Sequence, residues 1–186
     1  MILKKICILI FLVCFSGNQL IAQDKYHREY YTSGALKSKG WKKGKAKEGF
    51  WYFYHPNGKT AMEGHFENGK KEGFWYHYDS SGIKKKEGHY KNNDKNGYWY
   101  YYAKNGKKVT KEGHFVKGKA EKWWIIYDIA SGITRKHQYQ NNKKEGYCLL
   151  YRNNKLFKAE RYINDRKTGE WTDVFSFKRD NPNASL

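Results

Sequence analysis

The sequence predicts an all-β protein, an elongated antiparallel meander of repeated β-hairpins with no substantial helix after an N-terminal signal peptide. Three observations predict this fold class. An aromatic block recurs, starting at residues 49, 73, 97, 122, 146 and 169. Turn signals rich in Asn, Gly and Ser follow the first four blocks. The residues between the turns alternate as strand residues do, and a fixed period of this kind is the signature of a repeat architecture.

The first 22 residues differ from the rest and have the layout of a secretory signal peptide. Lys4 and Lys5 form a positively charged start, residues 6–15 are an unbroken apolar run, and Ala22 offers a cleavage point. The apolar run is about ten residues long, whereas a bilayer core needs about 20. We therefore expect an exported protein, in the periplasm, the cell envelope or outside the cell, without a transmembrane span after signal removal. A retained membrane anchor is the less favoured alternative.

Residues 23–175 are expected to form about six copies of a repeat of roughly 24 residues. The first blocks read Gly-Phe-Trp-Tyr-Phe-Tyr (49–54), Gly-Phe-Trp-Tyr-His-Tyr (73–78) and Gly-Tyr-Trp-Tyr-Tyr-Tyr (97–102). Each block leads into a turn. A second segment, which contains Glu-Gly-His (63–65, 87–89 and 112–114), ends in another turn. One repeat is therefore strand, turn, strand, turn.

Alternation along each strand separates the Trp and Tyr side chains onto opposite faces. Stacked repeats then form one column at Trp51, Trp75, Trp99, Trp124, Cys148 and Trp171, and another at Tyr54, Tyr78, Tyr102, Tyr127 and Tyr151. Glycines at 40, 64, 88 and 113 fit places where another side chain lies over the backbone, and we expect them to leave room for the rings. The positions expected to be structural are Gly49, Trp51, Tyr54, Gly58, Gly64, Gly73, Trp75, Tyr78, Gly82, Gly88, Gly97, Trp99, Tyr102, Gly106, Gly113, Trp124 and Tyr127.

The C-terminal end of the array is atypical. The last copy is the most polar, and residues 176–186 are expected to be a polar, disordered tail. Atypical terminal copies cap repeat arrays. Because a repeat advances by two strand spacings, about 9–10 Å, six repeats should extend over roughly 60 Å.

The pattern Gly-Phe-Trp-Tyr-Phe-Tyr-His-Pro-Asn-Gly-Lys (49–59), followed by Glu-Gly-His-Phe-Glu-Asn-Gly-Lys-Lys-Glu-Gly-Phe-Trp (63–75), resembles the MORN repeat in its bacterial variant form. The resemblance covers about residues 26–175; the copies beginning at Lys122, Gly146 and Gly169 depart from the pattern. It implies an elongated hairpin sheet more than a function. Exported proteins of Bacteroidetes-type bacteria commonly carry this variant, and some relatives are labelled antitoxin-like.

The repeat argues against catalysis and against a metal site. Two sets of residues recur in phase, His65, His89, His114 and His137, and Glu63, Glu87 and Glu112. Equivalent positions about 9–10 Å apart cannot share one ion or form a carboxylate pair, so the glutamates are expected to pair with lysines across strands. No known catalytic or phosphate-binding motif occurs, and Cys148 has the setting of a small buried apolar residue. We predict no enzyme, no cofactor and no metal.

The chain is strongly basic, with 37 Lys and Arg against 18 Asp and Glu. Many lysines cluster beside turns, which line the two long edges of the sheet, and the candidate binding residues are Lys70, Lys71, Lys84, Lys85, Lys86, Lys107, Lys108, Lys143 and Lys144. They either protect the sheet edges from pairing or attract an anionic surface such as lipid headgroups or an acidic glycan. Nucleic acid is the less favoured partner, because export is expected and Lys outnumbers the fork-shaped Arg.

Three functions are consistent with these features. The leading hypothesis is a non-enzymatic scaffold or binding module of the cell envelope that engages a protein or an anionic surface through basic turn edges. One alternative is a glycan-binding protein in which Trp51, Trp75 and Trp99 lie exposed and stack on sugar rings. The other is an antitoxin-like inhibitor of a partner protein. Burial of the tryptophan column would remove the platform that the glycan alternative needs.

Overall fold

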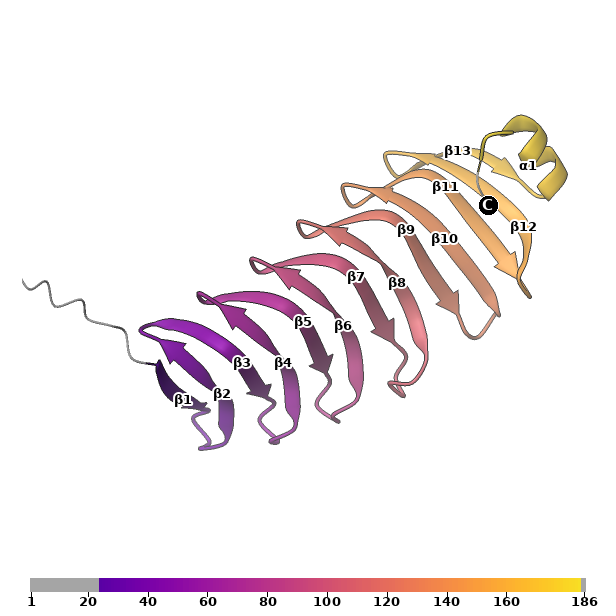
Figure 1. Cartoon of the computed structure of the whole chain (residues 1–186). Coiled ribbons are helices and arrows are strands. Elements are labelled where there is room, and N and C mark those ends of the chain that lie inside the picture. Colours follow the sequence, from indigo (N-terminus) through magenta and orange to yellow (C-terminus); the bar gives the residue numbers. More distant parts are fainter. Residues whose placement is uncertain (1–23, 185–186) are drawn as a thin grey trace, which may run out of the picture.

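In the computed structural model, which describes residues 24–184, the chain forms one antiparallel sheet of thirteen strands and one short helix (Figure 1). The elements are β1 (Asp24–Tyr30), β2 (Leu36–Lys43), β3 (Ala46–Tyr54), β4 (Thr60–Glu67), β5 (Lys70–Tyr78), β6 (Lys84–Lys91), β7 (Asp94–Tyr102), β8 (Val109–Val116), β9 (Lys119–Asp128), β10 (Ile133–Gln140), β11 (Lys143–Arg152), β12 (Lys155–Ile163), β13 (Arg166–Trp171) and α1 (Val174–Asp180). Each strand pairs with the next in sequence. This confirms the predicted meander; the expected signal peptide, residues 1–22, lies outside the described residues.

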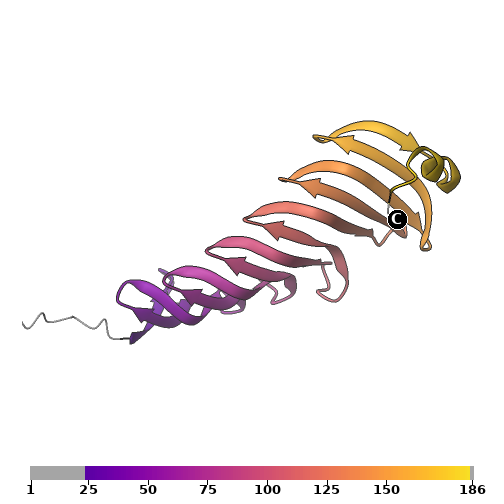
Figure 2. The same ribbon diagram turned by 45° about the horizontal axis from the view of Figure 1, so that its top comes forward.

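The sheet is elongated and largely a single layer (Figures 1 and 2). Its strands are bowed, and their direction changes gradually from β1 to β13, as the twist of strands about their own axes requires. Within residues 24–184, the element that lies over a face of the sheet is α1, which contacts β12 and β13. Most of both faces is therefore open.

Two-residue turns join consecutive hairpins, and their central residues have positive φ. The values are 50° and 77° at Asn68 and Gly69, and 52° and 74° at Asn92 and Asn93. Turns with two positive φ angles match the right-handed twist of the flanking strands, and Asn and Gly adopt these angles at the lowest cost. The predicted turn chemistry is confirmed at these positions.

A β-bulge in each of the strands β3, β5 and β7 explains why the first three aromatic blocks open with glycine. In the pairing of β4 with β5, His65 stands opposite Glu72 and Gly64 stands opposite Trp75, so two residues of β5, Gly73 among them, lack a partner on β4. Gly73 has φ 67°. The indole Nε1 of Trp75 donates to the carbonyl oxygens of His65 (3.1 Å) and Glu72 (3.2 Å). The bulge therefore supplies the acceptors that a buried indole N–H needs.

The tryptophans are the core of the sheet. Trp51, Trp75 and Trp99 are fully buried, and Trp124 is 1% exposed. Each ring lies on a glycine of the preceding strand, and a Cβ atom added to Gly88 would stand 2.5 Å from the Trp99 ring. The other contacts of this kind join Gly40 to Trp51, Gly64 to Trp75 and Gly113 to Trp124. This confirms the prediction that these glycines leave room for the rings.

The sheet has two chemically different faces. We call the face that carries Trp51, Trp75, Trp99 and Trp124 the tryptophan face, and the opposite one, which carries Tyr54, Tyr78, Tyr102 and Tyr127, the tyrosine face. On the tryptophan face, rings from the intervening strands pack edge-on between successive indoles. Phe66 lies 6.1 Å from Trp51 and 5.0 Å from Trp75 between ring centroids, and Tyr90 lies 5.9 Å from Trp75 and 5.1 Å from Trp99. The core is thus a row of alternating rings on one side of the sheet.

At β10 and β11 the glycine–tryptophan contact is replaced by another pair. His137 takes the glycine position and Cys148 takes the tryptophan position, with Nε2 3.7 Å from Sγ. Both residues are buried, which confirms the expected setting of Cys148. His137 is larger than the glycine that it replaces, and Cys148 is smaller than the tryptophan that it replaces. The packed volume is therefore conserved, and cores tolerate volume-conserving exchanges best.

The predicted continuation of the column to Trp171 is wrong. Trp171 stands opposite Ala159 and packs on the tyrosine face with Leu149. The bulge of β13 inserts one residue, Thr168, where the bulge of β5 inserts two. A one-residue change in register moves a side chain to the other face.

The predicted disordered tail is also wrong over its first part, because residues 176–180 belong to α1. The Asp173 carboxylate caps the helix by accepting a backbone N–H of its first turn (2.8 Å). Phe177 is fully buried between Tyr147 and Trp171, with ring centroids 5.3 and 5.4 Å away. A seven-residue helix with one buried side chain is too short to give a periodic sequence signal. α1 therefore covers the C-terminal end of the tyrosine face.

Candidate functional site

Lysines lie over the rings of the tryptophan face. The distance from Nζ to the indole centroid is 4.9 Å for Lys47 and Trp51, 4.6 Å for Lys71 and Trp75, and 4.6 Å for Lys95 and Trp99. In each case the lysine stands four residues before the tryptophan, on the strand that enters the bulge. Ammonium groups in this position are attracted by the ring quadrupole, and their methylene stems cover the indole.

Further along this face, lysines still lie over the rings although none stands four residues before the tryptophan. Ala120 stands four residues before Trp124, and Lys111 of β8 places its Nζ 4.7 Å from that ring instead. Lys144 of β11 lies over Tyr162 at 4.8 Å. Lys86 stands opposite His77 and Tyr101 on the same face. We give the name lysine row to six lysines of this face that form no ion pair with a described residue, and they are Lys47, Lys71, Lys86, Lys95, Lys111 and Lys144. Lys42, whose Nζ lies 6.0 Å from the Trp51 ring centroid, does not belong to the row because it pairs with Glu29.

Five members of the lysine row, Lys47, Lys71, Lys86, Lys95 and Lys111, are close enough for their positive charges to repel one another. Lys47 also has an acidic neighbour in Glu29. None of the six members of the row forms an ion pair with a residue that the structure describes. Burial lowers the pKa of Lys71, and the charges of Lys86 and Lys47 lower it further. Burial, with the charges of Lys86 and Lys111, lowers the pKa of Lys95 to about 8. A bound anion would offset this repulsion.

His77 lies in the middle of the lysine row. It stands opposite Lys86 on β6, and its Nε2 is 3.4 Å from the hydroxyl oxygen of Tyr90. Burial, together with the charges of Lys86, Lys71 and Lys95, lowers the pKa of His77 from 6.5 to about 3. The folded protein therefore keeps this imidazole neutral in mild acid.

Replacing His77 by phenylalanine is expected to reduce the acid sensitivity of the fold. As the pH falls from about 6.5 towards 3, the unfolded chain binds a proton at His77 that the folded chain does not, so the free energy of unfolding falls. Phenylalanine removes this contribution, and Phe53 shows that the ring fits, since it holds the equivalent position one repeat earlier, 6.3 Å from Trp75. Urea denaturation at pH 7 and pH 4 measures the difference. The exposed His65→Phe is the control, and an unchanged acid loss in His77→Phe would contradict the prediction.

The structure divides the predicted turn lysines between three places. Lys71, Lys86 and Lys144 belong to the lysine row. Lys84 lies on the tyrosine face with its Nζ 2.9 Å from a carboxylate oxygen of Glu87, and Lys85 occupies the neighbouring bulge of β6. The remaining predicted lysines are exposed at the turns, and they are Lys70, Lys107, Lys108 and Lys143. Only three of the nine predicted lysines therefore share one surface, and the predicted basic edges do not form a single binding site.

The sequence interpretation did not select Lys47, Lys95 and Lys111 as candidates. A signal for the first two was present, because a lysine recurs four residues before each of the first three column tryptophans. Lys111 carries no such signal, since it belongs to the strand before the one that holds its ring.

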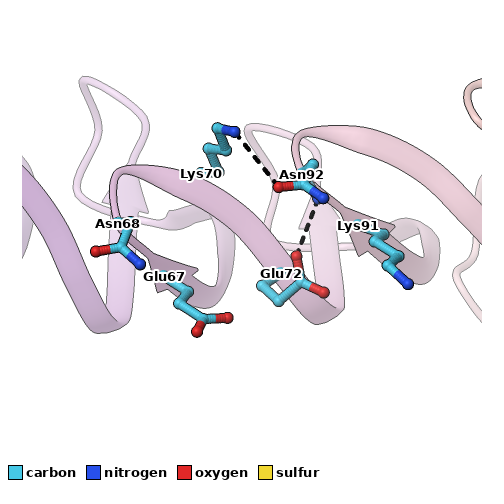
Figure 3. A pocket seen from close by; sticks show the side chains of 6 residues that line it. All are labelled: Glu67, Asn68, Lys70, Glu72, Lys91 and Asn92. Atoms are coloured by element: carbon cyan, nitrogen blue, oxygen red, sulfur yellow. Dashed lines mark hydrogen bonds between the residues drawn. The ribbon is translucent and has the colours of Figure 1, made fainter.

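One edge of the sheet is held together by hydrogen bonds between the turns of successive hairpins. The backbone N–H of Asn92 donates to the Glu72 carboxylate (2.9 Å), and the Lys70 ammonium donates to the Asn92 side chain (3.4 Å) (Figure 3). The shallow pocket at this edge is lined by Glu67, Asn68, Lys70, Glu72, Lys91 and Asn92. Because the pocket carries both positive and negative side chains, this edge attracts an anion much less strongly than the lysine row does.

The glutamates of the tyrosine face pair with tyrosine rather than with lysine alone, which corrects the expected lysine pairs. The hydroxyl of Tyr78 donates to Glu63 (2.8 Å) and that of Tyr127 donates to Glu112 (2.5 Å). Glu87 accepts from Tyr102 in the same way and also contacts Lys84. These carboxylates are therefore occupied by contacts within the sheet.

The burial of Trp51, Trp75 and Trp99 removes the exposed tryptophan platform of the glycan alternative. Within residues 24–184, no group of three or more His, Cys, Asp or Glu side chains is placed to hold a metal ion. In the same part of the chain, no helix has both the length and the apolar character needed to cross a membrane. Comparison with protein-family models and with curated proteins finds no match to this chain.

Proposed function

We propose that the protein is a non-enzymatic repeat scaffold of the cell envelope that binds an anionic partner through the lysine row. The observation that carries the proposal is that six lysines share one face without ion pairs to described residues. A lysine near an anionic surface contributes about 1 kcal/mol of attraction, so the whole row contributes several kcal/mol. The signal peptide expected from the sequence supports placement in the envelope.

The assignment to MORN-variant repeats is part of this proposal. The hairpin repeat and the regular contact of Gly64 with Trp75 and of Gly88 with Trp99 support it. Proteins built from stacked repeats present extended surfaces that hold partners. A scaffold function follows from that architecture.

The chemistry of the repeat supports a binding role rather than catalysis. Equivalent side chains on successive repeats stand about 9–10 Å apart, too far to act on one substrate atom. Burial raises the pKa of the Cys148 thiol to about 12. Nucleophilic cysteines are accessible and have lowered pKa values, so Cys148 has the setting of a packing residue.

Two triple variants with the same net charge test the proposal. Lys71→Gln/Lys95→Gln/Lys111→Gln removes three charges from the lysine row, and Lys70→Gln/Lys107→Gln/Lys143→Gln removes three from the turns. Binding is measured against phosphatidylglycerol vesicles and long-chain polyphosphate, at low and high salt. We expect binding that weakens with salt. At about 1 kcal/mol per lysine, the row variant should lose on the order of 100-fold in affinity, and the turn variant much less.

Circular dichroism would establish that both triple variants remain folded. Equal losses of affinity in the two variants would show that net charge, rather than the lysine row, determines binding. Failure of the unmodified protein to bind either anion at low ionic strength would exclude the proposed function.

A further inference from the structure

We infer that the anionic partner is a linear polyanion that lies along the lysine row, across the strands, rather than a flat anionic surface; this inference rests on the proposed function. The row begins at Lys47 on β3 and ends at Lys144 on β11. Eight strand spacings of about 4.8 Å separate these strands, so the row extends over about 38 Å. Between β3 and β8 the lysines follow one another at intervals of one or two strands. That arrangement suits a ligand with negative charges repeated along a chain.

The twist of the sheet favours a flexible chain over a plane. Neighbouring strands rotate by roughly 20–25° on average, and the strands of this sheet turn gradually along its length (Figure 2). A flat bilayer that contacts one end of the row therefore departs from the other end. A flexible polymer can follow the turning surface and reach every lysine.

The chemistry of the row indicates recognition by charge alone. Each indole of Trp51, Trp75 and Trp99 is enclosed between a glycine backbone and a lysine stem. These rings are therefore closed to stacking by nucleic-acid bases, on which single-strand binding depends. The lysine ammonium is a compact point charge without the bidentate fork of arginine, so it can bind phosphate, sulfate and carboxylate groups without strong preference. The ligand class is therefore a linear polyphosphate or an acidic polysaccharide.

The contacts around Lys95 support this assignment. Its Nζ donates to the hydroxyl of Tyr101 (2.9 Å) and lies 4.8 Å from the centroid of Phe115. The charges of Lys86 and Lys111, on the strands to either side, act on its ammonium group. The three ammonium groups thus come from β6, β7 and β8, and consecutive groups of one polymer chain can bridge them.

The test measures how affinity depends on ligand length and on salt. The ligands are polyphosphates of defined length, shorter and longer than the row, a polygalacturonate, single-stranded DNA of matched charge, and phosphatidylglycerol vesicles. Contacts to single-stranded nucleic acid change log K by about −0.7 per neutralised charge for each decade of salt, and the same value per contact predicts a slope of about −4 for six lysines on a long chain. Short chains should give a shallower slope. We expect affinity to rise with length until the chain spans the row.

The row variant Lys71→Gln/Lys95→Gln/Lys111→Gln should reduce the magnitude of the long-chain slope by about 2, because three contacts are lost. The turn variant Lys70→Gln/Lys107→Gln/Lys143→Gln should leave it nearly unchanged. Binding of polyphosphate, of polygalacturonate or of both would support the inference and identify the charged group.

Several outcomes would overturn the inference. Short and long chains that bind with equal affinity and equal slope would indicate a point site. DNA that binds more tightly than polyphosphate of the same charge would indicate recognition of bases. If vesicles bind through the row while neither polymer binds, the inference fails and the proposed function stands. If no anion binds, both fail.

Discussion

Replacing Trp75 by alanine is expected to lower the free energy of unfolding by about 3–5 kcal/mol. The ring is fully buried, it packs edge-on against Phe66 and Tyr90, and its Nε1 donates to two carbonyl oxygens. Alanine leaves a cavity in a core one ring thick and leaves both bulge carbonyls without their indole donor. Since domains are stable by about 5–15 kcal/mol, this loss is a large fraction of the total. Urea denaturation followed by circular dichroism measures it.

Trp41→Ala is the matched control for this substitution. Trp41 is 48% exposed on β2, and its ring meets Tyr26 rather than a row of buried rings. Removing it should cost much less, because most of its surface is already in water. Similar losses for the two variants would show that the tryptophan column is not the core of the sheet.

Replacing Gly88 by alanine is expected to cost up to about 3 kcal/mol, at the upper end of the cost of overpacking. The added Cβ would stand 2.5 Å from the ring of Trp99. The ring cannot move away freely, because its Nε1 donates to the carbonyl oxygen of His89 (3.0 Å) and Tyr90 packs against it at 5.1 Å. Either the ring or strand β6 must shift. Urea denaturation monitored by tryptophan fluorescence measures the loss.

A double-mutant cycle separates this steric cost from any other effect of the methyl group. In a Trp99→Leu background the ring is absent, so Gly88→Ala should cost far less than it does in the unmodified protein. An equal cost in both backgrounds would show that contact with the ring is not the reason for glycine at this position.

Much of the fold follows from one repeat read along the sequence. Because strands alternate with period two, Trp75 and Tyr78 fall on opposite faces as soon as the strand is assigned. Gly64 and Gly88 recur at the same phase as the tryptophans, and this recurrence predicts a contact between glycine and ring. These features are local and repeated, so the evidence for them accumulates over several copies.

The candidate site was only partly predictable, because it depends on where strands end. The sequence pattern predicts Lys71 beside a turn, but the turn has only two residues and β5 begins at Lys70. Lys71 therefore lies within the strand and over Trp75. Lys111 reaches a ring on the next strand, which depends on register and not on spacing. α1 was missed for a related reason, since its stability depends on a tertiary contact of Phe177.

The order of strands in the sheet has a consequence for how the chain folds. Each strand pairs with its sequence neighbour from β1 to β13, so every hairpin closes a short loop. Most all-β proteins fold slowly because distant segments must meet, and the entropy of closing long loops opposes them. Here the contact order is low despite the β structure. Folding can therefore begin at any hairpin and spread in both directions, and hairpins can form one after another as the chain is synthesised.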